Sequence, residues 1–197
     1  MTTLDKDVFE TRSPEAEADD GFVRRWSPRA FSGAPLSLDQ VRVLVEAARW
    51  APSCFNSQPW RFVYALNGDD RWTDMLAILM DMNQVWAQRA GVLIAVIAKT
   101  TFDDGKPAPT ASFDTGSAWM SMALQAQSMG LASHAMWGFH HEQAPATLEL
   151  PPDHGVQAMV AVGYPGEVSA LPEKYQEREV PSPRRPIDEL LFHGKLG

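Results

Sequence analysis

Two arginines and a serine stand within five residues near the start of the chain, at Arg25, Ser27 and Arg29. A guanidinium offers a planar fork of N–H donors that matches a phosphate or another delocalised anion, and a serine hydroxyl adds one more donor. The spacing therefore predicts an anion-binding segment. The alternative is that these arginines are solvated surface charges, which is the usual fate of arginine.

A loop of small and amide side chains follows further along, in the sequence Pro52-Ser53-Cys54-Phe55-Asn56. It ends an amphipathic helix at a proline and leads through Gln-Pro-Trp into an apolar strand, so it could offer hydrogen bonds to a planar polar ligand. The alternative is an ordinary helix-to-strand connection. Cys54 has no histidine or basic partner in its local sequence, and we interpret it as an inert small residue rather than a nucleophile.

Together the two motifs resemble the N-terminal half of the nitroreductase-like flavoproteins, whose members bind FMN. The resemblance extends through most of residues 22–192. It implies that Arg25 binds the phosphate, that Ser27 adds a hydroxyl contact, and that Arg29 lies near N1 and O2 of the flavin. Trp26 occupies the position between the first two of these cofactor-binding residues.

The resemblance also implies further site residues. Asn83 would hydrogen-bond the pyrimidine edge, Phe55 would face the substrate, and a backbone N–H near Gly138 would point at flavin N5. A basic residue near the C-terminus would close the phosphate site; the register favours Arg185 but leaves Arg184 open. The remaining cofactor-binding residues that the resemblance implies are Pro52, Ser53, Cys54 and Asn56, reaching the flavin across a dimer interface, and Met136 and Trp137 beside the redox edge.

The helices and strands that must position these residues can be predicted from the spacing of apolar residues and from residues that typically begin or end a helix. Ser37 and Gln40 form a capping-box pattern that predicts a helix start. Apolar runs at 62–66, 92–98, 131–137 and 157–162 predict strands, and apolar spacing predicts a helix near 72–86 that is broken and resumed. A helix is also expected over 114–129, ended by the glycine that follows it, and a helical turn is expected near 141–148. The alternation gives an α+β or α/β domain. The resemblance implies an α+β sandwich with a mostly antiparallel sheet.

Two features predict a homodimer. The helix over 114–129 carries almost no charge after its first residue, so it must be covered on most faces. The proline-rich tail ends in an apolar group, Ile187, Leu190, Leu191 and Phe192, that needs a surface to pack against. We expect residues 1–20 to be a flexible acidic segment and residues 21–197 to form one FMN-binding domain whose tail embraces the partner.

Composition excludes several classes of protein. A chain of 197 residues with 45% apolar composition can bury one good core. A net charge of −8 argues against nucleic-acid or membrane-surface binding, and no apolar run approaches a membrane span. A single cysteine excludes internal disulfides and favours a reducing, cytoplasmic location. The five histidines have no zinc-like spacing, and no Gly-x-Gly-x-x-Gly follows a strand, so neither a metal site nor a Rossmann site is expected.

The resemblance implies an oxidoreductase in which NAD(P)H reduces FMN and an electron-poor small molecule then reoxidises it by a ping-pong mechanism. Such acceptors include nitroaromatics, quinones and activated double bonds, among which the sequence does not choose. Two alternatives stay open. One is a flavoenzyme of the same fold with a different reaction, such as dehydrogenation, dehalogenation or flavin fragmentation. The other is a non-catalytic flavin-binding protein.

Overall fold

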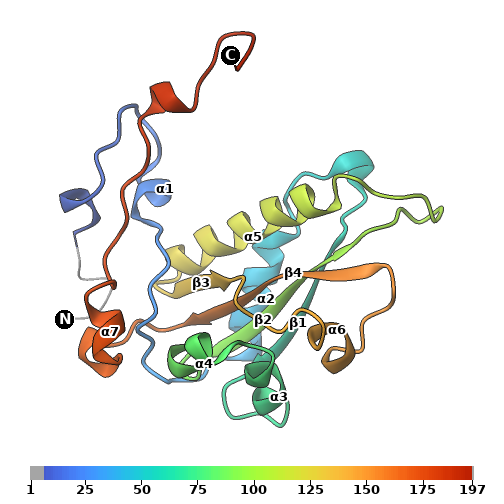
Figure 1. Ribbon diagram of the computed structural model, residues 1–197, viewed down its shortest axis with the longest axis horizontal. Coiled ribbons are helices and arrows are strands. Elements are labelled where there is room, and N and C mark those ends of the chain that lie inside the picture. Colours follow the sequence, from blue (N-terminus) through green and yellow to red (C-terminus); the bar gives the residue numbers. More distant parts are fainter. Residues whose placement is uncertain (1–6, 197) are drawn as a thin grey trace.

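A computed structural model describes residues 7–196 of the chain, and an antiparallel sheet of four strands lies at its centre (Figure 1). The strands lie in the order β1-β2-β4-β3, and every neighbouring pair is antiparallel. Their bounds are β1 Trp60–Leu66, β2 Val92–Lys99, β3 Ala132–Met136 and β4 His154–Gly163. The predicted α+β sandwich with an antiparallel sheet is therefore confirmed.

Helices cover both faces of the sheet. The longest are α2 and α5, which lie on one face, while α3, α4 and α6 lie on the other (Figure 1). The bounds of the helices are α1 Asp20–Arg24, α2 Leu38–Ala48, α3 Trp72–Ala77, α4 Asp81–Ala87, α5 Ala111–Ser128, α6 Ala144–Thr147 and α7 Glu173–Gln176, with short 3-10 turns at Val8–Glu10, Cys54–Asn56, Val168–Ala170 and Ile187–Glu189.

Local signals account for the ends of these helices. The Ser37 side chain accepts from the backbone N–H of Gln40 at 3.2 Å, and the Gln40 side chain accepts from the backbone N–H of Ser37 at 3.0 Å, so the capping box is formed. The helix expected near 72–86 is indeed broken, into α3 and α4. Gly130 has φ 70°, a left-handed conformation that ends α5 and leads into β3.

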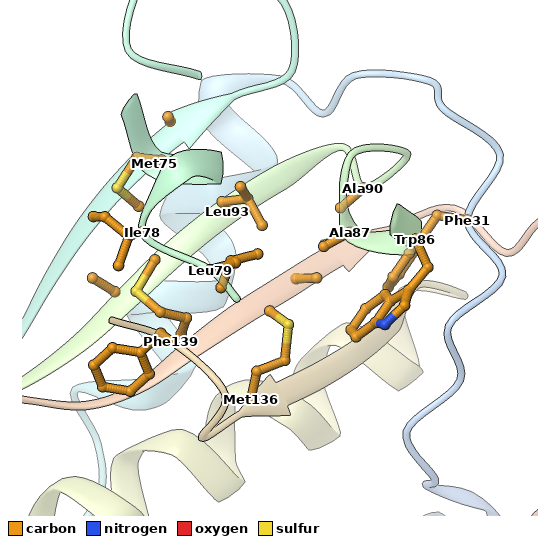
Figure 2. Close-up of a cluster of buried hydrophobic side chains, with 14 of the residues drawn as sticks. Phe31, Met75, Ile78, Leu79, Trp86, Ala87, Ala90, Leu93, Met136 and Phe139 are labelled. Atoms are coloured by element: carbon orange, nitrogen blue, oxygen red, sulfur yellow. The ribbon is translucent and has the colours of Figure 1, made fainter. Parts of the chain in front are cut away.

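The central strand β2 divides its side chains between two hydrophobic clusters, because successive residues of a strand point to opposite faces. Leu93 and Ile97 pack with α3 and α4, whereas Val92 and Ile94 pack with α2 and α5. Figure 2 shows the first cluster, in which Trp86 lies at one end of the sheet. A strand buried on both faces explains the continuous apolar run in the sequence.

The first described residues and the C-terminal tail run together away from the sheet (Figure 1). Arg12 Nε donates to the carbonyl oxygen of Ser182 at 2.9 Å, and the backbone N–H of Ile187 donates to the Glu15 carboxylate at 2.8 Å. We call residues 7–24 and 181–196 the arm. The apolar group at the end of the arm is exposed, up to 75% at Leu191, and so has surface available for a partner.

Candidate functional site

A cavity of about 310 Å³ lies where the arm meets the sheet, and its described lining is neutral or cationic. Five arginines contribute to it, together with Ser27 and His134. Arg25 Nη1 donates to Ser27 Oγ at 3.3 Å, so two residues of the first sequence motif are in contact. The cavity is lined by Arg12, Arg25, Trp26, Ser27, Arg29, His134, Arg178, Val180, Ser182 and Arg184. This arginine cavity is suited to an anion with more than one charge.

The arginines of this cavity repel one another, and burial together with this repulsion lowers the pKa of two of them. Burial, followed by the charge of Arg184, lowers the pKa of Arg25. Burial, then Arg184 and Arg25, lowers the pKa of Arg12 in the same way. An anion that binds between these cations relieves their mutual repulsion and so stabilises the folded protein.

Arg12 is a site residue that the sequence did not indicate, because it lies in a segment that otherwise reads as acidic and flexible. Its side chain is only 7% exposed. It donates to the carbonyl oxygens of Val23 at 2.5 Å, Arg25 at 2.8 Å and Ser182 at 2.9 Å. Arg12 thus joins the motif at residues 25–29 to the tail that carries Arg184.

The structure distinguishes the two C-terminal arginines. Both arginines line a cavity of about 490 Å³ within the arm, but of the two only Arg184 also lines the arginine cavity. Arg184 Nη1 also donates to the carbonyl oxygen of Ser182 at 3.2 Å. The geometry therefore favours Arg184 over Arg185, in contrast to the register suggested by the sequence, where no periodicity fixes the position of an extended tail.

His134 enters the cavity from β3. Its Nδ1 lies 3.1 Å from the carbonyl oxygen of Pro28, and its ring packs against Trp86 at an angle of 46°, with centroids 4.8 Å apart. Burial, reinforced by the charges of Arg29 and Arg25, lowers the pKa of His134 to about 4. The imidazole is therefore neutral at pH 7 and can donate to Pro28 without adding to the positive charge.

The lowered pKa of His134 predicts how stability depends on pH. In the unfolded chain the histidine takes up a proton near its ordinary pKa of 6.5, but in the folded protein it does so only near 4. Stability should therefore fall as the pH decreases from 6.5 to 4, by about 1–3 kcal/mol from this residue. Chemical unfolding of the apoprotein across this range should show a smaller loss for His134→Gln. His193→Gln, at an exposed position, should behave like the wild type; equal slopes in all three proteins would contradict the prediction.

Trp86 connects the arginine cavity to a second group of polar atoms. The guanidinium carbon of Arg29 lies 6.0 Å from the Trp86 ring centroid. Asn83 precedes Trp86 by three residues on α4, so their side chains share one face of that helix. Trp26 is only 7% exposed and lines both the arginine cavity and a small crevice over α5.

Asn83 and Gly138 form a close pair at the end of β3. Asn83 Nδ2 donates to the Gly138 carbonyl oxygen at 2.9 Å, and the backbone N–H of Met80 donates to the same oxygen at 3.1 Å. A Cβ on Gly138 would lie only 2.6 Å from Asn83 Nδ2, so a side chain at this position would displace the Asn83 amide. Of the two residues before it, Met136 packs in the core (Figure 2) and Trp137 is 72% exposed.

The loop around Cys54 lies at the start of α5 and has a strained backbone. The backbone N–H of Cys54 donates to Asp114 Oδ2 at 3.1 Å, and Asp114 is buried. Phe55 and Asn56 have φ values of 52° and 55°, an uncommon conformation for residues other than glycine. Strain of this kind often occurs at binding sites. Phe55 is 91% exposed.

Of the sequence-predicted residues, the structure brings together Arg25, Trp26, Ser27, Arg29 and Arg184 around one cavity, and it separately pairs Asn83 with Gly138. It does not bring the loop at 52–56 to them. That loop contacts Asp114 near the start of α5, whereas the crevice beside Arg25 and Trp26 is lined by Ala123 and Gln127 near its end. Gln127 lies thirteen positions after Asp114 on this helix, a distance of about 20 Å.

Comparison with known proteins decides the family. The family model described as "Nitroreductase family" matches residues 23–85 and 70–164 of this chain. The chain belongs to the nitroreductase family. A solved structure described as "The crystal structure of the oxidoreductase containing FMN" is 41% identical, with a TM-score of 0.91 and coverage of 94% of this chain and 96% of its own.

Two further proteins are similar to this member of the nitroreductase family over nearly its whole length. The protein named NADH dehydrogenase from Thermus thermophilus is 27% identical, over 93% of this chain and 99% of its own. A Desulfovibrio desulfuricans structure solved in complex with FMN is 25% identical, with a TM-score of 0.71 and coverage of 91% of this chain and 99% of its own.

Neither a metal centre nor a membrane-spanning helix occurs among residues 7–196. No three of the described His, Cys, Asp and Glu side chains converge in a way that could hold a metal ion. Within the same range, no helix has the length and apolar character needed to cross a bilayer.

Proposed function

We propose that this nitroreductase-family protein is an FMN-dependent oxidoreductase that transfers hydride from NAD(P)H to an electron-poor acceptor in two half-reactions. The observation that carries the proposal is the arginine cavity, linked through Trp86 to the close pair of Asn83 and Gly138. The similar oxidoreductase described as containing FMN supports the cofactor. Relatives named NADH dehydrogenase and NAD(P)H nitroreductase support the donor.

The residues present fit FMN. Its phosphate is dianionic and matches the excess of guanidiniums, among which Arg25, Ser27 and Arg184 would hold it. Its pyrimidine edge needs donors and acceptors, which the Asn83 amide can offer. Its ring needs a backbone segment that approaches closely, and Gly138 can provide one because glycine has no side chain to interfere.

When bound, FMN would supply the ring that accepts and donates hydride. The protein's own part is to orient and polarise. Arg29 would place a positive charge where negative charge gathers on reduction, which favours the reduced state. The hydrogen bonds from Asn83 and Met80 to the Gly138 carbonyl fix the segment that would face the redox edge.

The loop at 52–56 fits this proposal only in a homodimer. It lies about 20 Å along α5 from the end near Arg25, too far for both to contact one ring in one protomer. If two α5 helices cross about a two-fold axis, the start of one helix can lie near the end of the other. The partner's loop, with its exposed Phe55, would then complete each site.

Sedimentation should therefore give about twice the chain mass of 21.8 kDa. The outward face of α5 carries Phe113, which is 79% exposed, beside Gly116 and no charged residue. Phe113→Asp should convert the dimer to a monomer and remove FMN with it, because half of each site would leave. A monomeric wild type that retains flavin would contradict the shared site.

The test of function has two stages. Release of the cofactor by denaturation and chromatography should give FMN; FAD, or a colourless protein that refuses added FMN, would overturn the proposal. Anaerobic mixing with NADH and with NADPH should then bleach the flavin, and nitroaromatics, quinones or activated alkenes should restore its colour. A flavin that neither nucleotide bleaches at catalytic speed indicates a binding protein, and one that no acceptor reoxidises indicates a different reaction.

The proposal includes a cytoplasmic location. Cys54 is the single cysteine of the chain and is half-buried as a free thiol, which suits a reducing compartment. Fractionation of the native source would test it, with flavin-linked activity expected in the cytosolic fraction.

A further inference from the structure

A carboxylate lies buried directly behind the first sequence motif. Glu179 follows α7 and has no exposed surface, at 0%. Its Oε1 accepts the backbone N–H of Arg29 at 2.6 Å and that of Ala30 at 2.8 Å. Its Oε2 lies 3.8 Å from Arg29 Nη1. Glu179 therefore contacts both the backbone and the guanidinium of one residue.

The two backbone bonds do not by themselves require a charge. The amide oxygen of a glutamine could accept both N–H groups from the same place. Burying a carboxylate is costly unless a cation compensates it, and the guanidinium of Arg29 is such a cation. Glu179 and Arg29 are thus opposite charges close enough to act on each other.

We infer that Glu179 is a positioning residue that holds Arg29 in place and offsets part of its charge. Glu179 thereby keeps the reduction potential of the bound flavin below the value that Arg29 alone would set. This inference rests on the proposed function, since it assumes that Arg29 lies at the ring edge. Removing the negative charge of Glu179 makes the electrostatic potential at the flavin ring more positive, because the charge of Arg29 is no longer offset. That change favours the reduced state.

The sign of the effect separates this role from a merely structural one. If Glu179 only holds the backbone, its loss would let Arg29 move away, and the potential would fall, as we expect it to do in Arg29→Gln. If it offsets charge, Glu179→Gln raises the potential while Arg29→Gln lowers it. The double variant has neither charge and should return close to the wild-type value.

Redox titration of the FMN-loaded wild type, Glu179→Gln, Arg29→Gln and the double variant tests the inference. We expect Glu179→Gln to favour reduction by about tenfold, which is about 30 mV for a two-electron couple. The matched control is Glu177→Gln, which removes the same charge from an exposed position two residues away and should not shift the potential. A lowered or unchanged potential in Glu179→Gln overturns the inference.

Thermal unfolding of the apoproteins gives a second readout that needs no flavin. Glu179→Ala should be less stable than Glu179→Gln, because alanine leaves the N–H groups of Arg29 and Ala30 buried without their acceptor. If Glu179→Gln does not fold, the comparison of the double variant with Arg29→Gln decides, because a return from a lowered potential in Arg29→Gln to the wild-type potential in the double variant requires that the two charges offset each other. A wild type that binds no FMN overturns the proposed function and the inference with it, whereas normal FMN binding with no opposite shifts overturns only the role of Glu179.

Discussion

Arg25→Gln should weaken FMN binding by about tenfold to a hundredfold, since a hydrogen bond to a charged group is worth about 1.5–3 kcal/mol and each 1.4 kcal/mol is a factor of ten. Arg25 lies in the arginine cavity beside Ser27, where a phosphate would bind. The potential of the flavin that remains bound should be near normal, because Arg25 would act on the phosphate and not on the ring. Fluorescence titration of the apoprotein with FMN measures the affinity.

The same substitution should not destabilise the apoprotein. Burial and the charge of Arg184 lower the pKa of Arg25, so without an anion the charged side chain is held unfavourably. Removing it should leave the melting temperature unchanged or raise it, while the stabilisation on adding FMN becomes smaller. Weaker binding together with a marked loss of apoprotein stability would instead show that Arg25 is a structural residue.

Arg24→Gln is the matched control. It removes the same charge from the neighbouring residue, whose side chain is exposed and lies 3.6 Å from the Asp20 carboxylate. A surface ion pair of this kind contributes little to stability. The affinity for FMN should therefore stay close to that of the wild type, and an equal loss in both variants would mean that only the general charge of this face matters.

The sequence predicted those parts of the fold that are specified locally. The capping box at Ser37 and Gln40, the broken helix over 72–86 and the stop at Gly130 are signals carried by neighbouring residues, and the structure contains all three. The doubly buried strand β2 was also predicted, because a short, unbroken apolar run without helical period is typical of a strand that is covered on both faces.

The contacts that build the site are not local, and this is why several were missed. Arg12 meets a carbonyl 170 residues away, and Glu179 meets a backbone N–H 150 residues away. Neither has a periodic neighbourhood that would signal burial. Arg184 and Arg185 are adjacent in an extended tail, so only the three-dimensional path shows that Arg184 lines the arginine cavity.

Gly138→Ala should slow flavin reduction by NAD(P)H by about tenfold to a hundredfold, the cost that a displacement of about 1 Å can impose on a positioned reaction. The new Cβ would lie 2.6 Å from Asn83 Nδ2, so the amide must move and lose its 2.9 Å bond to the Gly138 carbonyl. Stability should fall by about 1 kcal/mol, because the Asn83 amide can move aside but loses its hydrogen bond. Stopped-flow reduction and thermal unfolding measure the two effects.

Gly155→Ala serves as the control, because there the nearest atom to the new Cβ is Gln157 Nε2 at an ordinary contact distance of 3.6 Å. It should leave the rate of flavin reduction unchanged. If Gly138→Ala matches it in both rate and stability, the requirement for glycine at this position is wrong.

A double-mutant cycle with Asn83→Ala separates the two reasons for glycine at position 138. Asn83→Ala removes the atoms that the new Cβ would strike, so the losses of stability should be strongly non-additive and the double variant should be about as stable as Asn83→Ala alone. The reduction rate can behave differently. If the backbone at Gly138 must also approach the ring closely, the double variant should remain slower than Asn83→Ala, because the added methyl group would still limit that approach. Equal rates would assign the whole requirement for glycine to the hydrogen bond with Asn83.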